Sequence, residues 1–214
     1  MRTAKFGLLL LALLFFWGCA GLKPSKELPD LGEKKKTPKA IRAEAVVELK
    51  KMITLSGRAT IMAKSPDLFR IEVLGPFNHV MALLVSDGST LYAFSGGEIE
   101  KKDWEDPALP YSFKAKEVVS FLLGSQYPKN KAAQKADNIE VLTDKDGHIS
   151  KIVKYKKGSA SLTVMMSDYR DISGAHIPFN IHIEDGKRTL KIKYSDVEID
   201  PELSEDFFSL EALP

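Results

Sequence analysis

The stretch IPFNIHIE, residues 177–184, decides the fold class of this chain. Apolar residues occupy its odd-numbered positions, and the residues between them are Pro178, Asn180, His182 and Glu184. Successive side chains of a β-strand point to opposite faces of a sheet, so a period of two predicts a strand with one buried face. The stretch therefore predicts a sheet that the rest of the molecule covers on one side.

The same period of two recurs on both sides of this stretch. It covers residues 53–63, 69–73, 79–85, 91–94, 98–102, 138–143, 149–155, 160–167 and 189–199. Short turns such as Asp87-Gly88 and Asp185-Gly186 join neighbouring segments, which predicts antiparallel pairing. In the last segment the apolar positions change phase, and a β-bulge near Ser195 would explain the change.

Two segments follow a helical period instead. The segment from Lys39 to Met52 predicts an amphipathic helix, with a stripe that consists of Ile41, Ala45, Leu49 and Met52. Residues 113–123, FKAKEVVSFLL, predict a second helix that Gly124 ends. Two short helices cannot cover about ten one-sided strands, unless the sheet bends around them.

We therefore expect a mainly β (α+β) fold. A strongly curved antiparallel sheet would form a half-barrel of about 10–11 strands, with the helices as a lid across its open, apolar side. The interior would be either a packed core or an apolar cavity, and the pattern leaves both open.

The N-terminal residues predict export and a lipid anchor. Arg2 and Lys5 precede an apolar run that is about half the ~20 residues a membrane-spanning helix needs, which is typical of a secretory signal over residues 1–18. Cys19, the only cysteine, follows directly and resembles the lipidated residue of a bacterial lipobox. Residues 19–37 are rich in Pro, Lys and Glu and predict a flexible tether, so the folded domain would span 38–214.

Charge excludes one class of partner. Loss of Arg2 and Lys5 with the signal lowers the Lys and Arg count from 31 to 29, which equals the 29 Asp and Glu residues. A neutral domain without a basic stripe is not expected to bind nucleic acid. Because Ala20 rather than Asp follows the cysteine, we expect the outer membrane as the site of anchoring, with the folded domain facing the periplasm.

The sequence contains no recognisable catalytic motif. GxxxxGK[ST], HExxH and GxSxG are all absent from it. The even spacing of His176 and His182 would put both on one face of a strand, but no third metal ligand is near in sequence. The acidic loop at Asp103, Glu105 and Asp106 could hold a pair of catalytic carboxylates, but carboxylates in a loop are usually solvated. We expect no enzyme activity, no cofactor and no metal site.

An apolar loop tip points to binding instead. Turns usually select polar residues, yet Pro76 and Phe77 stand between Gly75 and Asn78 in a predicted hairpin turn. An exposed aromatic side chain there would suit insertion into a membrane or a partner. The alternative is that Phe77 folds back onto the core.

Several short motifs carry a resemblance to a known family. In order they are LSGRA at 55–59, LFRIEV at 68–73, LGPF at 74–77, VSDG at 85–88 and the helical segment 112–124. Over residues 55–198 they resemble the LolB/LolA-like outer-membrane lipoprotein-localisation family, LolB more than LolA, although DFFSL at 206–210 is closer to LolA-type endings. The resemblance implies a half-barrel with a helical lid over an apolar cavity.

The resemblance also implies a function. A protein of this kind accepts the acyl chains of lipoproteins from a periplasmic LolA-like carrier and inserts them into the outer membrane. Phe77, with Pro76, matches the membrane-insertion loop, where LolB-like proteins have a protruding leucine. The expected wall of the acyl-chain cavity consists of Leu55, Ile61, Phe69, Ile71, Val73, Phe94, Phe121, Leu122, Phe179 and Ile181.

Two other functions remain compatible with the sequence. One is an anchored carrier or sensor of another lipid or glycolipid. The other is a cell-envelope interaction module with a filled core and no ligand. In each case we expect a monomer.

Overall fold

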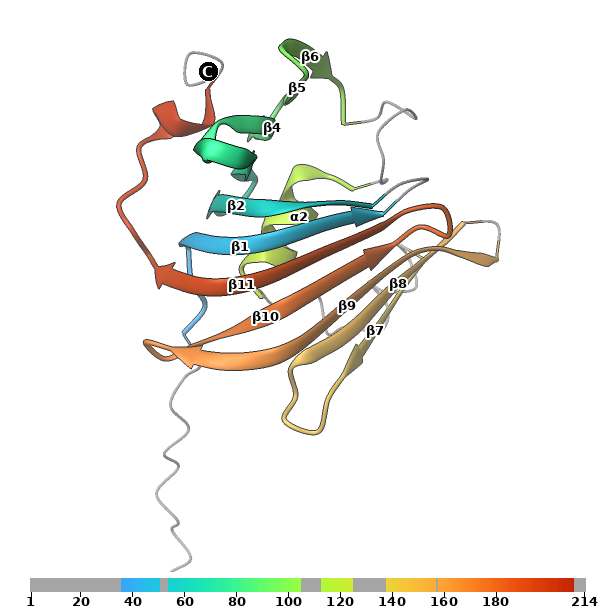
Figure 1. Cartoon of the computed structure of the whole chain (residues 1–214). Coiled ribbons are helices and arrows are strands. Elements are labelled where there is room, and N and C mark those ends of the chain that lie inside the picture. The colour runs from blue at the N-terminus through green and yellow to red at the C-terminus, as the bar shows by residue number, and fades with distance from the viewer. Residues whose placement is uncertain (1–35, 51–53, 105–112, 125–137, 157, 210–214) are drawn as a thin grey trace, which may run out of the picture. The chain divides into compact units, whose positions relative to one another are not determined.

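The computed structural model describes residues 36–50, 54–104, 113–124, 138–156 and 158–209. The predicted signal, Cys19 and all but the end of the predicted tether lie outside this part. Eleven strands form one antiparallel sheet in the order β6-β5-β4-β3-β2-β1-β11-β10-β9-β8-β7 (Figure 1). The strands are β1 Ala40–Lys50, β2 Thr54–Lys64, β3 Leu68–Leu74, β4 Val80–Asp87, β5 Leu91–Ser95, β6 Glu98–Lys102, β7 Ile139–Thr143, β8 Ile149–Lys156, β9 Ser159–Ile172, β10 Ala175–Glu184 and β11 Thr189–Ile199.

The sheet consists of two meanders. β1 to β6 follow one another in the sheet, as do β7 to β11, and antiparallel pairing of β1 with β11 joins the two halves. β6 and β7 are the two free edges, so the curved sheet is not closed into a barrel. This confirms the predicted class of a curved antiparallel half-barrel. The predicted bulge is confirmed as well, because the β1–β11 register shifts at Ser195.

The predicted helix over 39–52 is wrong. Residues 40–50 form β1, which pairs with β2 on one side and β11 on the other. Three of the four stripe residues, Ile41, Ala45 and Leu49, also fit a period of two. In the strand, Ile41, Ala43, Ala45 and Val47 are buried and Arg42 lies between two of them. Pairing on both edges satisfies the backbone of β1, and this tertiary context overrides a local helical pattern.

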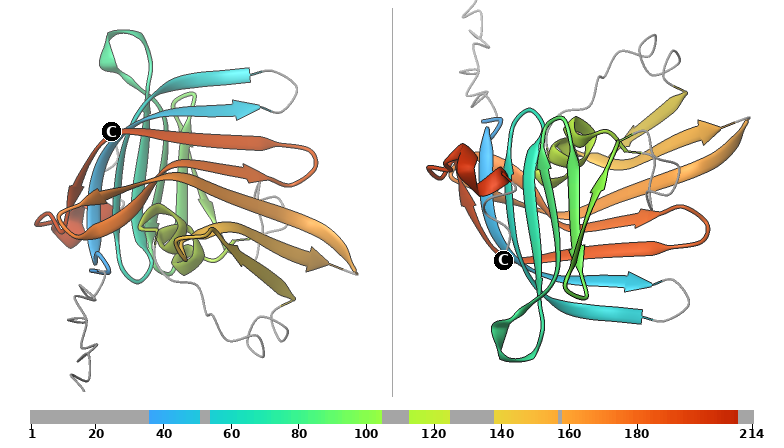
Figure 2. Two further views of the ribbon diagram at one scale, coloured as in Figure 1. Left: turned by 90° about the horizontal axis from the view of Figure 1, so that it is seen from below. Right: turned by 90° about the horizontal axis from the view of Figure 1, so that it is seen from above.

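The inner face of the sheet carries the main core. Side chains from both meanders and from the helix α2, Ala115–Leu122, share one buried cluster, which we call the concave-face cluster. α2 lies between the two arms of the curved sheet (Figure 2). Its completely buried members include Ile41, Ile61, Phe69, Phe121, Ile152 and Ile177.

A smaller cluster covers part of the outer face. We call it the outer-face cluster, and its buried members are Ala40, Leu83, Val85, Leu203 and Phe208. The last two belong to the segment that ends in the 3-10 helix η3, Glu205–Phe208, which packs on β3 and β4. Arg70 is buried beneath it, where its side chain donates to Glu72 at 2.6 Å and to the Phe207 carbonyl at 3.3 Å. The C-terminal segment thus covers apolar side chains on the outer face of β3, β4 and β5.

The predicted second helix is confirmed as α2, two residues shorter at its start. The chain leaves it through Gly124, whose φ of +61° is the left-handed conformation usual after a helix. A Cβ on Gly124 would lie 2.5 Å from the Pro178 ring, so this place accepts no side chain. Among the described residues, no helix is long and apolar enough to cross a membrane.

Asp200 ties the two ends of the domain together, and we expect this tie to depend on pH. Its carboxylate accepts from the backbone of Lys39 at 2.7 Å and of Ala40 at 3.2 Å, and pairs with Lys36 at 2.8 Å. Burial raises the pKa of Asp200, but the Lys36 ammonium and the two backbone donors outweigh it and hold the pKa below its ordinary value. A carboxyl with a lowered folded-state pKa stabilises the fold above about pH 4 and loses this contribution as pH falls further.

Asp200→Asn should therefore lower the free energy of unfolding at pH 7 by up to about 1 kcal/mol, since a half-exposed ion pair contributes little. The difference from the natural chain should shrink at pH 3, where the carboxyl is protonated. Urea unfolding at the two pH values measures this, with Asp196→Asn on the exposed side of β11 as the control. An equal difference at both pH values would contradict the explanation.

Candidate functional site

The concave face and its covering helix form the first part of the candidate site. α2 has only eight residues, and Ala115, Val119, Phe121 and Leu122 are its buried side chains. Phe121 packs edge-on against Phe113, with ring centroids 5.0 Å apart. The helix therefore presents an apolar side to the sheet, and its period follows from VVSFL, where apolar residues recur at helical spacing.

Polar contacts fix α2 at both ends. The Lys154 ammonium on β8 lies 2.6 and 2.7 Å from the two carboxylate oxygens of Glu117, both side chains being largely buried. Glu117 also accepts from the Lys114 backbone at 2.8 Å at the start of the helix. At the other end, the Tyr194 hydroxyl donates to the Leu122 carbonyl at 3.2 Å, and burial raises the pKa of Tyr194 far above its ordinary value. α2 is thus held to the sheet by these polar contacts and by its buried apolar side chains.

Glu117→Gln should loosen α2 without unfolding the domain. The amide keeps an acceptor for Lys114, but the largely buried Lys154 ammonium loses the negative charge of Glu117, at a cost of about 1–3 kcal/mol. Hydrogen exchange of the α2 amides should become roughly 5- to 150-fold faster, if local opening sets the rate. Lys116→Gln on the exposed side of the same helix is the control, and unchanged exchange in Glu117→Gln would show that the ion pair does not hold the helix.

Eight of the ten residues expected in the cavity wall meet in or beside the concave-face cluster. Ile71 and Val73 are partly buried against it, and the fully buried ones are Ile61, Phe69, Phe121, Leu122, Phe179 and Ile181. Phe94 needs correction: it packs in the outer-face cluster and pairs across the sheet with Leu83. On β5, Leu91 rather than Phe94 belongs to the concave-face cluster. Leu55 belongs to β2, but its side chain lies outside the described part.

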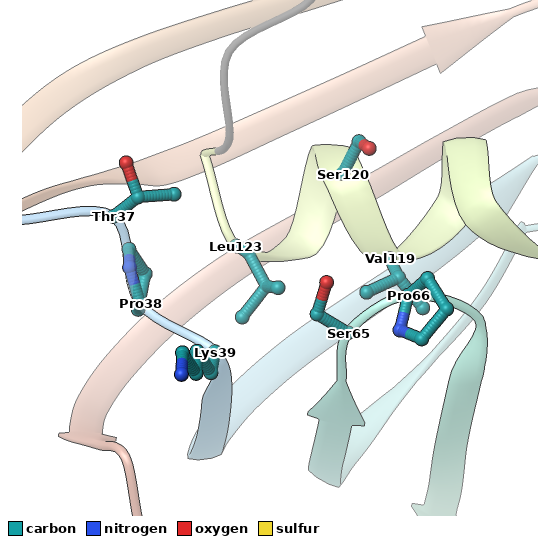
Figure 3. A pocket seen from close by; sticks show the side chains of 8 residues that line it. All are labelled: Thr37, Pro38, Lys39, Ser65, Pro66, Val119, Ser120 and Leu123. Carbon is teal, nitrogen blue, oxygen red and sulfur yellow. The ribbon is translucent and has the colours of Figure 1, made fainter.

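A pocket of about 400 Å³ opens beside α2 (Figure 3). It lies between the helix, the residues before β1 and the β2–β3 turn, and its lining residues are Thr37, Pro38, Lys39, Ser65, Pro66, Val119, Ser120 and Leu123. The volume lies in the range of small-molecule sites. Its lining mixes hydroxyl groups and an amine with apolar groups, so it suits an acyl chain less well than the apolar concave face does. None of the predicted wall residues lines it.

The loop between β3 and β4 forms the second part of the candidate site. It contains the short 3-10 helix η2, Pro76–Asn78, and the side chain of Phe77 is fully exposed, at 101%. Phe77 therefore does not fold back onto the core. Its φ of +61° is unusual for a bulky residue, and a conformation of this kind persists only where neighbours impose it.

Neighbouring side chains hold this loop in shape. The Arg58 guanidinium on β2 donates to the Asn78 side chain, and His79 Nδ1 lies 2.5 Å from the Pro76 carbonyl oxygen. Met81, itself 39% exposed, packs so closely on Gly75 that a Cβ there would lie 2.5 Å from its Cγ. The loop that exposes Phe77 to solvent is thus held in a defined conformation by these contacts.

The remaining predicted positions are placed as follows. Asp103 is exposed, whereas Glu105 and Asp106 lie outside the described residues. His176 does not pair with His182; its Nδ1 lies 3.2 Å from Nε2 of His148, which comes from a different turn. Because this contact joins residues 28 positions apart, spacing within one strand could not reveal it. The Glu117–Lys154 ion pair escaped sequence reasoning for the same reason.

Comparisons with known proteins agree on the fold. No family model matches the sequence, and no curated protein matches it either. A LolA superfamily protein from Nitrosomonas europaea is 12% identical, with a TM-score of 0.57 over 84% of this chain and 94% of that one. A domain named as an outer membrane lipoprotein-sorting protein, from Vibrio parahaemolyticus, is also 12% identical, with a TM-score of 0.57 over 81% and 90% of the two chains.

A third solved structure, a DUF1329 family protein from Desulfovibrio piger, is 14% identical. Its TM-score is 0.59, over 84% of this chain and 93% of that one. Likeness at such low identity concerns the backbone architecture. The curved eleven-stranded sheet with its inner helix therefore has the fold of LolA superfamily and lipoprotein-sorting proteins.

Proposed function

We propose that this chain is an outer-membrane lipoprotein, anchored through Cys19, that accepts the acyl chains of other lipoproteins and inserts them into the outer membrane. The donor would be a periplasmic LolA-like carrier, which makes the chain LolB-like in function. The observation that carries the proposal is the fully exposed Phe77 at the end of a sheet whose apolar concave face is covered by one short helix. The fold, shared with a lipoprotein-sorting domain, supports it.

The concave face offers what acyl chains require. Each buried CH₂ is worth about 0.8 kcal/mol, so a free chain in water is strongly disfavoured and has to pass from one apolar surface to another. Partly buried side chains such as Ile71, Val73 and Leu84 lie at the margin of the concave-face cluster. An acyl chain would enter there and displace α2. This movement would have to break the Glu117–Lys154 ion pair and the Tyr194–Leu122 hydrogen bond. No covalent step and no nucleotide are needed.

The length of the predicted tether fits insertion through Phe77. β3 runs from the pocket end at Pro66 to the loop at Phe77, so the tip lies roughly 23 Å or more from the end where residues 36–39 enter the domain. The predicted tether could extend to roughly 60 Å, which exceeds this length. Phe77 could therefore reach the same membrane that holds the anchor.

A transfer assay tests the proposal. The full chain in detergent or in vesicles is mixed with a soluble carrier that holds a lipoprotein with labelled acyl chains, and crosslinking follows the label. Transfer that falls strongly in Leu122→Glu supports the acceptor function. If no label passes to the natural chain, and mass spectrometry instead finds another lipid bound to it, the protein is a carrier of that lipid; if no lipid is found, it is an interaction module.

A further inference from the structure

Two histidines, one from the β7–β8 turn and one from the start of β10, meet in the C-terminal meander. His148 ends the turn between β7 and β8, and His176 is the second residue of β10. Nε2 of His148 lies 3.2 Å from Nδ1 of His176. The contact bridges over β9, which lies between β8 and β10 in the sheet. Neither histidine belongs to the concave-face cluster.

Each imidazole has a carboxylate at its other nitrogen. Oδ2 of Asp144 lies 3.2 Å from Nδ1 of His148, and Oδ2 of Asp171 lies 3.6 Å from Nε2 of His176. Backbone donors of Asp146 and His148 hold the second oxygen of Asp144, each at 2.9 Å. Histidines that bind metals typically donate their distal N–H to a carboxylate, as His148 can to Asp144, whereas Asp171 lies at an ion-pair distance from His176.

The tautomers of the two rings decide what lies between the facing nitrogens. If each carboxylate receives an N–H, neither of the two facing nitrogens carries a hydrogen, and their lone pairs repel unless a cation lies between them. Two imidazoles bound to Zn²⁺ at ~2.0–2.1 Å with tetrahedral geometry have nitrogens roughly 3.3 Å apart. The observed 3.2 Å matches this edge of a coordination tetrahedron.

The surroundings keep the two rings in place. His148 stacks on Tyr169 of β9, with ring centroids 4.6 Å apart and planes 14° apart. The Tyr169 hydroxyl donates to the Ile149 carbonyl at 2.7 Å, which fixes it to the start of β8. Among the described residues, Asp144, Asp146 and His148 have ligand atoms within 4.8 Å of one another, and His176 does not belong to this group. The ring positions are therefore largely set before any ion binds.

We propose that His148 and His176 bind one divalent transition-metal ion of the Zn²⁺ type, with water completing its coordination. The ion would join the β7–β8 turn to the start of β10 and so stabilise the C-terminal meander, β7 to β11. Asp144 and Asp171 act as positioning residues that orient the two rings. The site is independent of acyl-chain transfer.

Zinc titration of the full chain in detergent, after removal of metals with a chelator, tests the proposal. Calorimetry should find one equivalent of Zn²⁺ bound, and His148→Ala or His176→Ala should abolish it. Asp171→Asn should weaken binding about 10- to 100-fold, because it removes the charge that orients His176. His182→Gln on the same strand is the matched control and should bind as the natural chain does. Circular dichroism establishes that each variant is folded.

Substitution with Co²⁺ provides a second readout. A Co²⁺ ion on these ligands should give the visible absorption of low-coordinate nitrogen sites, and the absorption should be lost in both histidine variants. Absence of Zn²⁺ and Co²⁺ binding to the folded natural chain would overturn the proposal, and the two rings would then share a proton. Binding that survives in folded His148→Ala and His176→Ala would overturn it as well.

Discussion

Phe77→Glu should lower delivery of lipoprotein from this chain into membranes by at least about 10-fold, while leaving acceptance from the carrier intact. Insertion of a phenylalanine side chain into an apolar phase is worth about 1.5–3 kcal/mol, which corresponds to roughly 10- to 100-fold, and a carboxylate resists entry besides. Because Phe77 is fully exposed and packs on nothing in the core, its replacement should change the free energy of unfolding by less than about 0.5 kcal/mol.

Two control variants distinguish loss of membrane insertion at Phe77 from a general effect of an added surface charge. Phe77→Leu keeps an apolar tip and should retain most of the delivery. Ile99→Glu places the same charge on an apolar side chain that is 48% exposed on the edge strand β6, away from the loop, and should have little effect. Vesicle flotation measures membrane binding and a labelled acyl chain measures delivery. If Phe77→Glu delivers as well as Ile99→Glu does, the loop has no insertion role.

The local alternation of apolar and polar residues was sufficient to predict most strands of the sheet. The alternation over 177–184 became β10, whose odd-numbered side chains are all buried, together with Pro178, and α2 formed at VVSFL, where the apolar spacing is helical. Phe77 could be singled out because an aromatic residue in a turn has no local structural reason. These features depend on neighbours within a few residues, which a sequence shows directly.

The errors have a common cause in long-range pairing. Residues 40–50 satisfy both a helical and a strand period, and only the distant partners β2 and β11 decide between them. Phe94 was assigned to the concave side because an apolar strand was expected to have one buried face. The segment that ends in η3 instead covers part of the outer face, where Leu83 and Val85 of β4 pack with Tyr92 and Phe94 of β5 in the outer-face cluster. The His148–His176 contact likewise exists only once two hairpins are aligned.

Phe69→Ala is expected to have the largest effect on stability. Phe69 is completely buried in the concave-face cluster, and its ring packs edge-on against Trp104 with centroids 5.9 Å apart. Truncation of a packed phenylalanine costs about 3–5 kcal/mol, from lost transfer energy and the cavity left behind. In a domain of this size the melting temperature should fall by roughly 6–20 °C. Phe77→Ala is the matched control, since it removes the same atoms from an exposed place and should leave the melting temperature unchanged.

The size of this loss also decides how acyl chains are bound. A loss of several kcal/mol means that the concave face is packed while α2 is in place, so a chain can bind only where it displaces the helix. Lipid binding should then be stronger in Glu117→Gln, because loosening α2 removes part of the energy that opening costs. A loss below about 1 kcal/mol would contradict close packing at Phe69 and would indicate that the ring borders an open cavity. In that case acyl chains could enter without movement of α2, and Glu117→Gln should leave their affinity unchanged.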